Sequence, residues 1–227
     1  MEMEITVPEE VAVMTLPGAV FFPQALMPLH IFEPRYRRML RDALASNRLF
    51  AVAGLNAAAG SDPLQFEPPH RIATLGMVRA CQGSEAGNSN LLLQGICRVE
   101  VVRIIQEEPY RRIQIRALAS ESGAPAEANQ ALRRELARLI NLRQKLSGAV
   151  AGEMTAFLKT IEDPEAFVDM AAFSLCEDGV LKQRLLETLD VHCRLKLFGN
   201  GLRREIQSIK LRQKLQGSLP DGRIEEN

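Results

Sequence analysis

The sequence predicts an α+β fold, in which a β-rich N-terminal half with one helix precedes a helical C-terminal half. Apolar and polar residues alternate with period two over residues 111–119, as in a strand with one buried face. Beyond the polar break at residues 120–125, apolar residues recur at helical spacing instead. With 227 residues, 46% of them apolar, the chain can bury a core. We therefore predict domains at 9–121 and 122–217 and a flexible tail at 218–227.

The N-terminal half contains six predicted strands. Each is a short apolar or alternating run bounded by Pro, Gly or polar residues. The runs span residues 11–16, 25–29, 49–54, 72–82, 91–105 and 111–119. Gly76 and Gly95 fall inside two of these runs and predict bulges or tight bends, which the corners of a small barrel require.

One helix is expected within this half, beginning at Pro34, because proline suits the first turn of a helix. Asn47 is predicted to close the helix in a left-handed conformation. Apolar side chains form one stripe along it: Tyr36, Met39, Leu40, Ala43 and Leu44. We expect this stripe to plug one open end of the barrel.

The C-terminal half contains five predicted helices, marked by apolar residues at helical spacing. They cover residues 132–146 and 149–160, and three more begin after residues 163, 179 and 190. Asp163 followed by Pro164 is a typical helix start, with a capping carboxylate and a proline at the first position. Gly199 and Gly201 interrupt the last stripe. Since glycine in a helix costs about 1 kcal/mol relative to alanine, we expect a kink or a break there.

Composition excludes several classes of function. Lys+Arg and Asp+Glu both total 28, so the formal net charge is zero. This argues against binding of nucleic acid or of an anionic membrane as the main function. No run is long and apolar enough for a membrane span, and the acidic start lacks the apolar core of a signal peptide. The four widely spaced cysteines fit a reducing cytoplasm rather than a disulfide framework: Cys81, Cys97, Cys176 and Cys193.

Motifs for catalysis and cofactor binding are absent. There is no P-loop, no G-x-G-x-x-G after a strand and no G-x-S-x-G. His192 and Cys193 are the only adjacent pair of zinc-ligand residues, and neighbours on a helix point about 100° apart. We expect Cys193 to fill a core position and His192 to lie at the surface. His30 is expected to hold a backbone hydrogen bond, with an acid–base pair to Glu33 as the alternative. No catalytic residue, metal or cofactor is therefore predicted.

Residues 16–36, LPGAVFFPQALMPLHIFEPRY, resemble the start of the Lon protease N-terminal domain, and LHIFEPRY is similar to its stand-alone members. Residues 76–80 and 95–101 resemble two further strands of that family. In the helical half, Asp163-Pro164 and residues 182–187 resemble its helical part. The resemblance covers about residues 11–215 and implies a PUA-like pseudo-barrel followed by a helical bundle.

In the full protease this region helps to capture substrate proteins and supports hexamer assembly, and the ATPase and protease domains follow it. Neither domain is expected here, because the chain ends at Asn227. The resemblance thus implies a non-enzymatic, cytoplasmic module that binds unfolded or tagged polypeptides, with a protease as a further partner and homo-oligomer formation left open.

Candidate substrate-binding residues group aromatic side chains and charge near loops: Phe22, Phe32, Glu33, Arg35 and Tyr36. The competing interpretation is that the phenylalanines are core and the prolines shape turns. An alternative function is RNA binding by a PUA-like surface, since Tyr36 interrupts the basic run 35–41. Nucleic acid is not the expected partner, because Tyr36 also falls on the apolar stripe. An enzyme acting on a small molecule would need a deep pocket with convergent polar groups, and no sequence motif predicts one.

Overall fold

A computed structural model of the chain describes residues 6–56, 68–84, 87–147 and 153–217. The chain divides into two compact units. The first comprises residues 1–121 and 169–190, and the second comprises residues 122–168 and 191–227. The predicted domains 9–121 and 122–217 stay a prediction, and the predicted tail at 218–227 lies outside the described residues.

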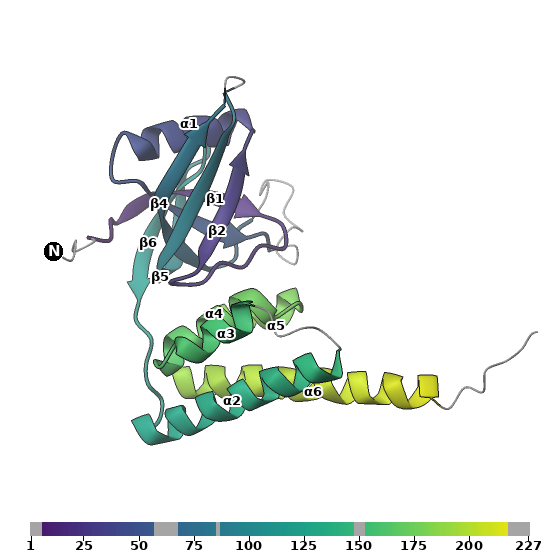
Figure 1. Cartoon of the computed structure of the whole chain (residues 1–227). Coiled ribbons are helices and arrows are strands. Elements are labelled where there is room, and N and C mark those ends of the chain that lie inside the picture. Colours follow the sequence, from purple (N-terminus) through teal and green to yellow (C-terminus); the bar gives the residue numbers. More distant parts are fainter. Residues whose placement is uncertain (1–5, 57–67, 85–86, 148–152, 218–227) are drawn as a thin grey trace, which may run out of the picture. The chain divides into compact units, whose positions relative to one another are not determined.

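Six strands form the framework of the first unit (Figure 1). They are β1 (Glu10–Leu16), β2 (Leu26–Ile31), β3 (Leu49–Gly54), β4 (Ile72–Gly83), β5 (Ser89–Gln106) and β6 (Arg112–Leu118). Each overlaps a predicted strand, with ends that differ by at most two residues. The sheet order is β2-β5-β4-β3-β1-β6, and β6 also pairs with β5. Five strands therefore close into a ring around an apolar core, while β2 is added to β5 outside that ring. The predicted α+β class is confirmed.

Glycines shape the pairing of β4 with β5. Leu75 pairs with Cys97 and Gly76 pairs with Gly95, so Ile96 is an extra residue in β5. This register shift confirms the predicted bulge. At Gly95, a Cβ atom would stand 2.1 Å from the carbonyl oxygen of Phe22. Only glycine therefore lets the loop between β1 and β2 lie directly against β5.

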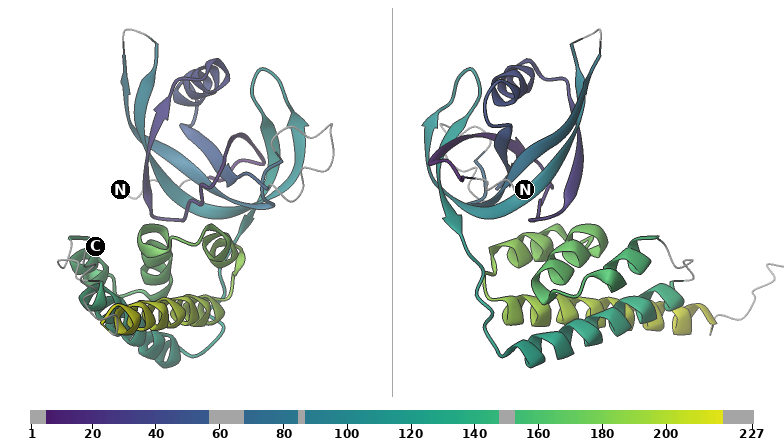
Figure 2. Two further views of the ribbon diagram at one scale, coloured as in Figure 1. Left: turned by 90° about the vertical axis from the view of Figure 1, so that its right-hand side faces the viewer. Right: turned by 60° about the vertical axis from the view of Figure 1, so that its left-hand side comes forward.

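Helix α1 (Pro34–Leu44) buries its predicted apolar stripe, with Tyr36, Met39, Leu40 and Ala43 all inside. In both views of Figure 2 the helix lies between the β4–β5 and β5–β6 hairpins. Tyr110, in the β5–β6 turn, donates a hydrogen bond from its hydroxyl to Asp42 (2.8 Å).

The predicted left-handed cap at Asn47 is wrong. Arg48 takes the positive φ of 62°, and the side-chain oxygen of Asn47 accepts a hydrogen bond from the Leu49 amide (3.1 Å). A short polar side chain that bonds the backbone two residues ahead shapes a turn without a left-handed conformation of its own.

Two further helices belong at least partly to the first unit. Helix α4 (Pro164–Leu175) contributes its residues from Asp169 onward, and helix α5 (Gly179–Glu187) lies wholly within the unit. The predicted start of α4 is confirmed, because a carboxylate oxygen of Asp163 accepts a hydrogen bond from the Ala166 amide (2.7 Å). Asp178 caps α5 in the same way.

The second unit contains helices α2 (Ala126–Leu146), α3 (Glu153–Thr160) and α6 (Val191–Gly217). Residues 149–152 of the helix predicted at 149–160 lie outside the described part of the chain. Helices α2 and α6 run side by side (Figure 1). Arg143 bonds Glu205, and the side chain of Gln213 bonds the carbonyl of Leu146, so the two helices run parallel.

Two details of α6 differ from what was expected. The helix is continuous through residues 199–201, so the expected break is absent. A Cβ on Gly199 would stand 3.1 Å from a methyl group of Leu136 in α2, so close packing of the two helices offsets the helical cost of this glycine. Near its start, Cys193 is exposed, whereas His192 is half-buried and its Nδ1 lies 2.8 Å from the side-chain oxygen of Asn129. The bond to α2 turns His192 inward and leaves Cys193 at the surface.

Candidate functional site

The five predicted substrate-binding residues fall into two environments. Phe22 is completely buried, and Tyr36 is buried with its hydroxyl donating to the Thr15 carbonyl (3.2 Å). Neither side chain presents a surface to a ligand. Phe32, by contrast, is 59% exposed, and the side chains of Glu33 and Arg35 are each more than one-third exposed. We call these three residues, which lie after β2 and in the first turn of α1, the exposed turn.

Neighbouring contacts hold the exposed turn in place. The Phe32 ring stacks on His30, with the ring centroids 5.9 Å apart, and His30 Nδ1 lies 2.7 Å from the side-chain oxygen of Asn90. His30 thus bonds a side chain instead of the expected backbone group. Glu33 accepts a hydrogen bond from Arg35 Nε (2.9 Å), and the Arg35 guanidinium lies 4.6 Å from the Tyr36 ring centroid. The result is an ordered arrangement of one apolar ring and one ion pair at the surface.

Phe22 belongs to a second cluster, which we call the buried anchor: Phe22, Arg98 and Asp169. Both ends of the Arg98 guanidinium donate to the Asp169 carboxylate, at 2.7 and 2.8 Å. Arg98 Nε donates to the Leu186 carbonyl near the end of α5 (3.0 Å), and its guanidinium lies 5.9 Å from the Phe22 ring centroid. Both charged side chains are only 2% exposed. One arginine of β5 therefore holds α4 and α5 against the strands.

The buried anchor is a feature that sequence reasoning missed. The signal was present, because Arg98 interrupts an apolar strand and Asp169 interrupts the apolar run of α4. Charged residues are almost never fully buried unless they are paired. Two isolated charges of opposite sign in buried segments therefore indicate a pair, although the sequence cannot say which charge meets which.

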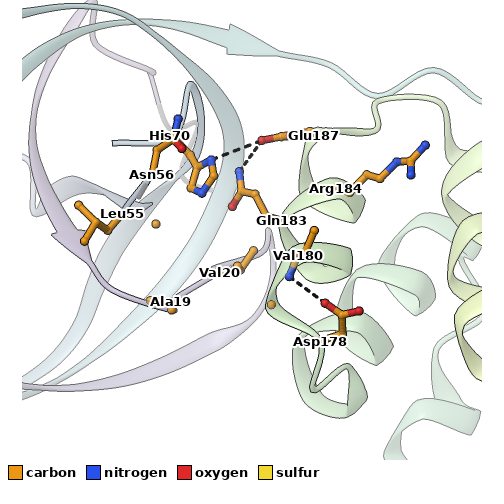
Figure 3. A pocket seen from close by; sticks show the side chains of 13 residues that line it. Ala19, Val20, Leu55, Asn56, His70, Asp178, Val180, Gln183, Arg184 and Glu187 are labelled. Carbon is orange, nitrogen blue, oxygen red and sulfur yellow. Dashed lines mark hydrogen bonds and ion pairs between the residues drawn. The ribbon is translucent and has the colours of Figure 1, made fainter. Parts of the chain in front are cut away.

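A cavity of about 700 Å³ opens between the segments that follow β1 and β3 and one side of α5 (Figure 3). Its volume is in the range of small-ligand pockets. It is lined by residues 18–20, 54–56 and 178–180 and by His70, Gln183, Arg184 and Glu187. These residues come from distant parts of the sequence, so no local motif could have predicted the cavity.

Hydrogen bonds order one wall of this cavity. Gln183 Nε2 donates to the carbonyl of Ile72 (3.2 Å) and to Glu187 Oε1 (2.8 Å). The same Glu187 oxygen lies 3.8 Å from His70 Nδ1. Asp178 Oδ1 accepts hydrogen bonds from the amides of Val180 (3.0 Å) and Leu181 (3.1 Å). The wall thus presents two carboxylates and an amide on α5.

A second carboxylate cluster lies on β5. Glu100 receives hydrogen bonds from Arg71 and from Arg116, and its side chain is only 8% exposed. The bond from Arg71, followed by that from Arg116, lowers the pKa of Glu100 below its ordinary value of 4.5. Glu100 is therefore ionised at neutral pH, where its charge is balanced by the two arginines, and the bond from Arg116 joins β5 to β6.

Two kinds of site are absent from the described residues. Within that part of the chain, no three His, Cys, Asp or Glu side chains come together in a way that could hold a metal ion. The helices described there also include none with the length and hydropathy of a membrane span.

Comparison with known proteins gives a consistent result. The family model described as "ATP-dependent protease La (LON) substrate-binding domain" matches residues 10–204. The Lon protease of Desulfosudis oleivorans is 27% identical over 216 residues, which cover 94% of this chain and 26% of that protein. Lon protease 1 of Herpetosiphon aurantiacus is 27% identical over 225 residues, which cover 97% of this chain and 27% of that protein. The chain thus spans about a quarter of the length of these relatives.

Solved structures agree on the fold. The N-terminal domain of the Mycobacterium avium complex Lon protease superposes with a TM-score of 0.65 at 18% identity, covering 87% of this chain and 98% of that domain. The Lon N-terminal domain protein from Xanthomonas campestris gives a TM-score of 0.57 at 17% identity, covering 83% of this chain and 96% of that protein.

Proposed function

The chain belongs to the family of the Lon substrate-binding domain, and on this premise we propose that it is a non-catalytic module that binds unfolded or tagged polypeptides. The observation that carries the proposal is the exposed turn. Phe32 is 59% exposed, and its ring is held in place by stacking on His30. An exposed, ordered aromatic ring of this kind can pack against apolar side chains of a bound polypeptide.

Strand β2 extends this surface. It pairs with β5 but with no other strand in the described part of the chain, and its Leu26 is 48% exposed. An edge strand beside an exposed aromatic side chain offers both backbone groups and apolar area to an extended polypeptide. Pro28 in β2 removes one backbone donor, so we assign most of the binding to side chains rather than to strand addition.

RNA binding receives no comparable support. That alternative depended on Tyr36 as a stacking aromatic residue within a basic run, and the Tyr36 ring lies on the buried face of α1. No two cysteines form a disulfide within the described residues, which fits our proposal of a cytoplasmic protein. A protease partner and homo-oligomer formation stay predictions.

The test measures binding of a fluorescently labelled, reduced and carboxymethylated protein, which cannot refold, by anisotropy. Phe32→Ala is expected to weaken binding by about tenfold or more, since burial of a phenylalanine is worth about 1.5–3 kcal/mol. Because Phe32 is exposed, the variant should melt like the parent.

Val102→Ala is the matched control, because Val102 is 52% exposed in the same unit but lies on β5 away from the turn. It should bind like the parent. Equal affinity of Phe32→Ala and the parent, or equal losses in both variants, would contradict the assignment of this surface.

A further inference from the structure

We propose that the cavity beside α5 binds an aliphatic cation, meaning an ammonium or guanidinium group on an apolar stem. The proposal concerns a site separate from the exposed turn, and it stands whether or not polypeptides bind there. Such a group can belong either to a lysine or arginine side chain of a polypeptide or to a free amine.

The charges of the cavity wall favour a cation. Asp178 and Glu187 place carboxylates at the two ends of α5, and among the described residues Glu187 contacts the uncharged Gln183 and His70. The one arginine of the lining, Arg184, extends away from the other labelled side chains in Figure 3. Opposite charges within a partly enclosed, less polar space attract more strongly than in open water.

Gln183 supplies an independent indication of a missing donor. The residue is 6% exposed, and its buried Oε1 has no hydrogen-bond partner among the residues that the structure describes. The oxygen faces Gly54 in the cavity lining, 3.6 Å from where a Cβ would stand. The amide cannot simply be flipped, since Nε2 already donates to Ile72 and Glu187. An unmet acceptor of this kind calls for a donor.

The remaining lining fits an apolar stem. Val20 and Leu55 line one side, and Val180 lies on α5 with 82% of its surface exposed. Methylene groups can lie along such side chains while the charged end reaches one of the two carboxylates.

An anion is the wrong occupant, although a helix N-terminus ordinarily attracts one. Asp178 already caps α5 by accepting from the amides of Val180 and Leu181. A carboxylate thus occupies the position where a phosphate would bind, and it repels a second negative charge.

The experiment titrates the ¹⁵N-labelled full chain with N-acetyl-lysine methylamide and, separately, with putrescine, and follows amide chemical shifts by NMR. We expect saturable shifts at Gly54, Val180 and Gln183 with at least one probe. Binding of the lysine derivative alone identifies a polypeptide side chain as the source, and binding of putrescine alone identifies a free amine. The Nε-acetylated lysine derivative, which lacks the charge, should leave these signals unchanged.

Glu187→Gln should weaken binding about fivefold or more, because it removes one charged partner while keeping the shape of the side chain. Glu177→Gln is the matched control, since Glu177 is exposed one residue before Asp178 but does not line the cavity. Val180→Lys places an ammonium group at the cavity and should abolish binding without unfolding the helix. Phe32→Ala should leave these shifts intact, so this proposal and the proposed function fail independently.

The inference is overturned if no probe gives saturable shifts at the cavity, or if the acetylated derivative gives the same shifts. It is equally overturned if Glu177→Gln and Glu187→Gln lose affinity to the same extent, because the effect would then be general electrostatic attraction.

Discussion

The buried anchor and the exposed turn contain the same three chemical groups in opposite surroundings. Each has a phenylalanine, an arginine and a carboxylate: Phe22, Arg98 and Asp169 in one, and Phe32, Arg35 and Glu33 in the other. The anchor side chains are at most 2% exposed, whereas those of the turn are at least about one-third exposed. Composition is therefore not what separates a structural cluster from a candidate binding surface in this protein.

Burial changes what the ion pairs contribute. In the buried anchor, Arg98 makes two hydrogen bonds to Asp169 and a third to the end of α5. Removing either charged side chain would therefore leave the charge of the other unpaired in the protein interior. In the exposed turn, water solvates Glu33 and Arg35 whether or not they pair. The first pair fixes the fold, whereas the second stays in contact with solvent at the surface.

Breaking the buried anchor is the largest expected effect. Asp169→Ala should lower the free energy of unfolding by about 3–5 kcal/mol, because Arg98 is left buried without its counter-ion. Urea unfolding followed by circular dichroism measures the loss. The double variant Arg98→Met with Asp169→Leu should recover most of it, since neither charge is then buried. A loss below about 1 kcal/mol for Asp169→Ala would show that the pair does not hold the unit together.

The ion pairs of Glu100 are intermediate in burial between those of the buried anchor and the exposed turn. The Glu100 carboxylate is largely buried, whereas its partners Arg71 and Arg116 are 78% and 69% exposed. Its pKa is lowered by the hydrogen bond from Arg71 and then by that from Arg116. A carboxyl with a lowered pKa in the folded state adds stability above its unfolded pKa, and this stability is lost as the pH falls through the folded pKa.

Glu100→Gln should therefore be less stable than the parent at neutral pH, and the gap should narrow as the pH falls below the ordinary value of 4.5. Urea unfolding at a series of pH values from neutral to acid measures the gap. A difference that stays constant over this range would show that Glu100 acts through packing rather than charge.

The exposed turn should give the smallest effect on stability. Glu33→Gln and Arg35→Gln are each expected to change the free energy of unfolding by less than about 1 kcal/mol, as for other surface ion pairs. The same urea series measures them beside Asp169→Ala. A loss in either variant that approaches the loss in Asp169→Ala would remove the distinction between the two regions.

Much of the fold could be predicted from the sequence, because its signals are local. Alternation over residues 111–119 predicted β6, Gly76 and Gly95 predicted the bulge, and Asp163 predicted the start of α4. Apart from the local error at Asn47, predictions failed where a neighbour in space decided the outcome. Packing of Gly199 against Leu136 kept α6 unbroken, and the bond between His192 and Asn129 reversed the expected burial of His192 and Cys193.

For the candidate site, the sequence found the right segment but could not separate its residues. Phe22 and Phe32 both lie in residues 16–36, beside proline and charge, and only their contacts distinguish them. The cavity beside α5 could not be predicted at all, because its lining joins residues 18–20, 54–56 and 178–180.

By itself, the sequence determined the strands, the helices and the cap at Asp163, since each depends on residues close together in the chain. The tertiary structure alone decided which charges are buried and which stay in water. It carried residues 169–190 back to the strands, joined Asp169 to Arg98 and formed the cavity wall. The physical reason is that burial, pairing and unmet hydrogen bonds depend on neighbours in space, and distance along the chain does not specify those neighbours.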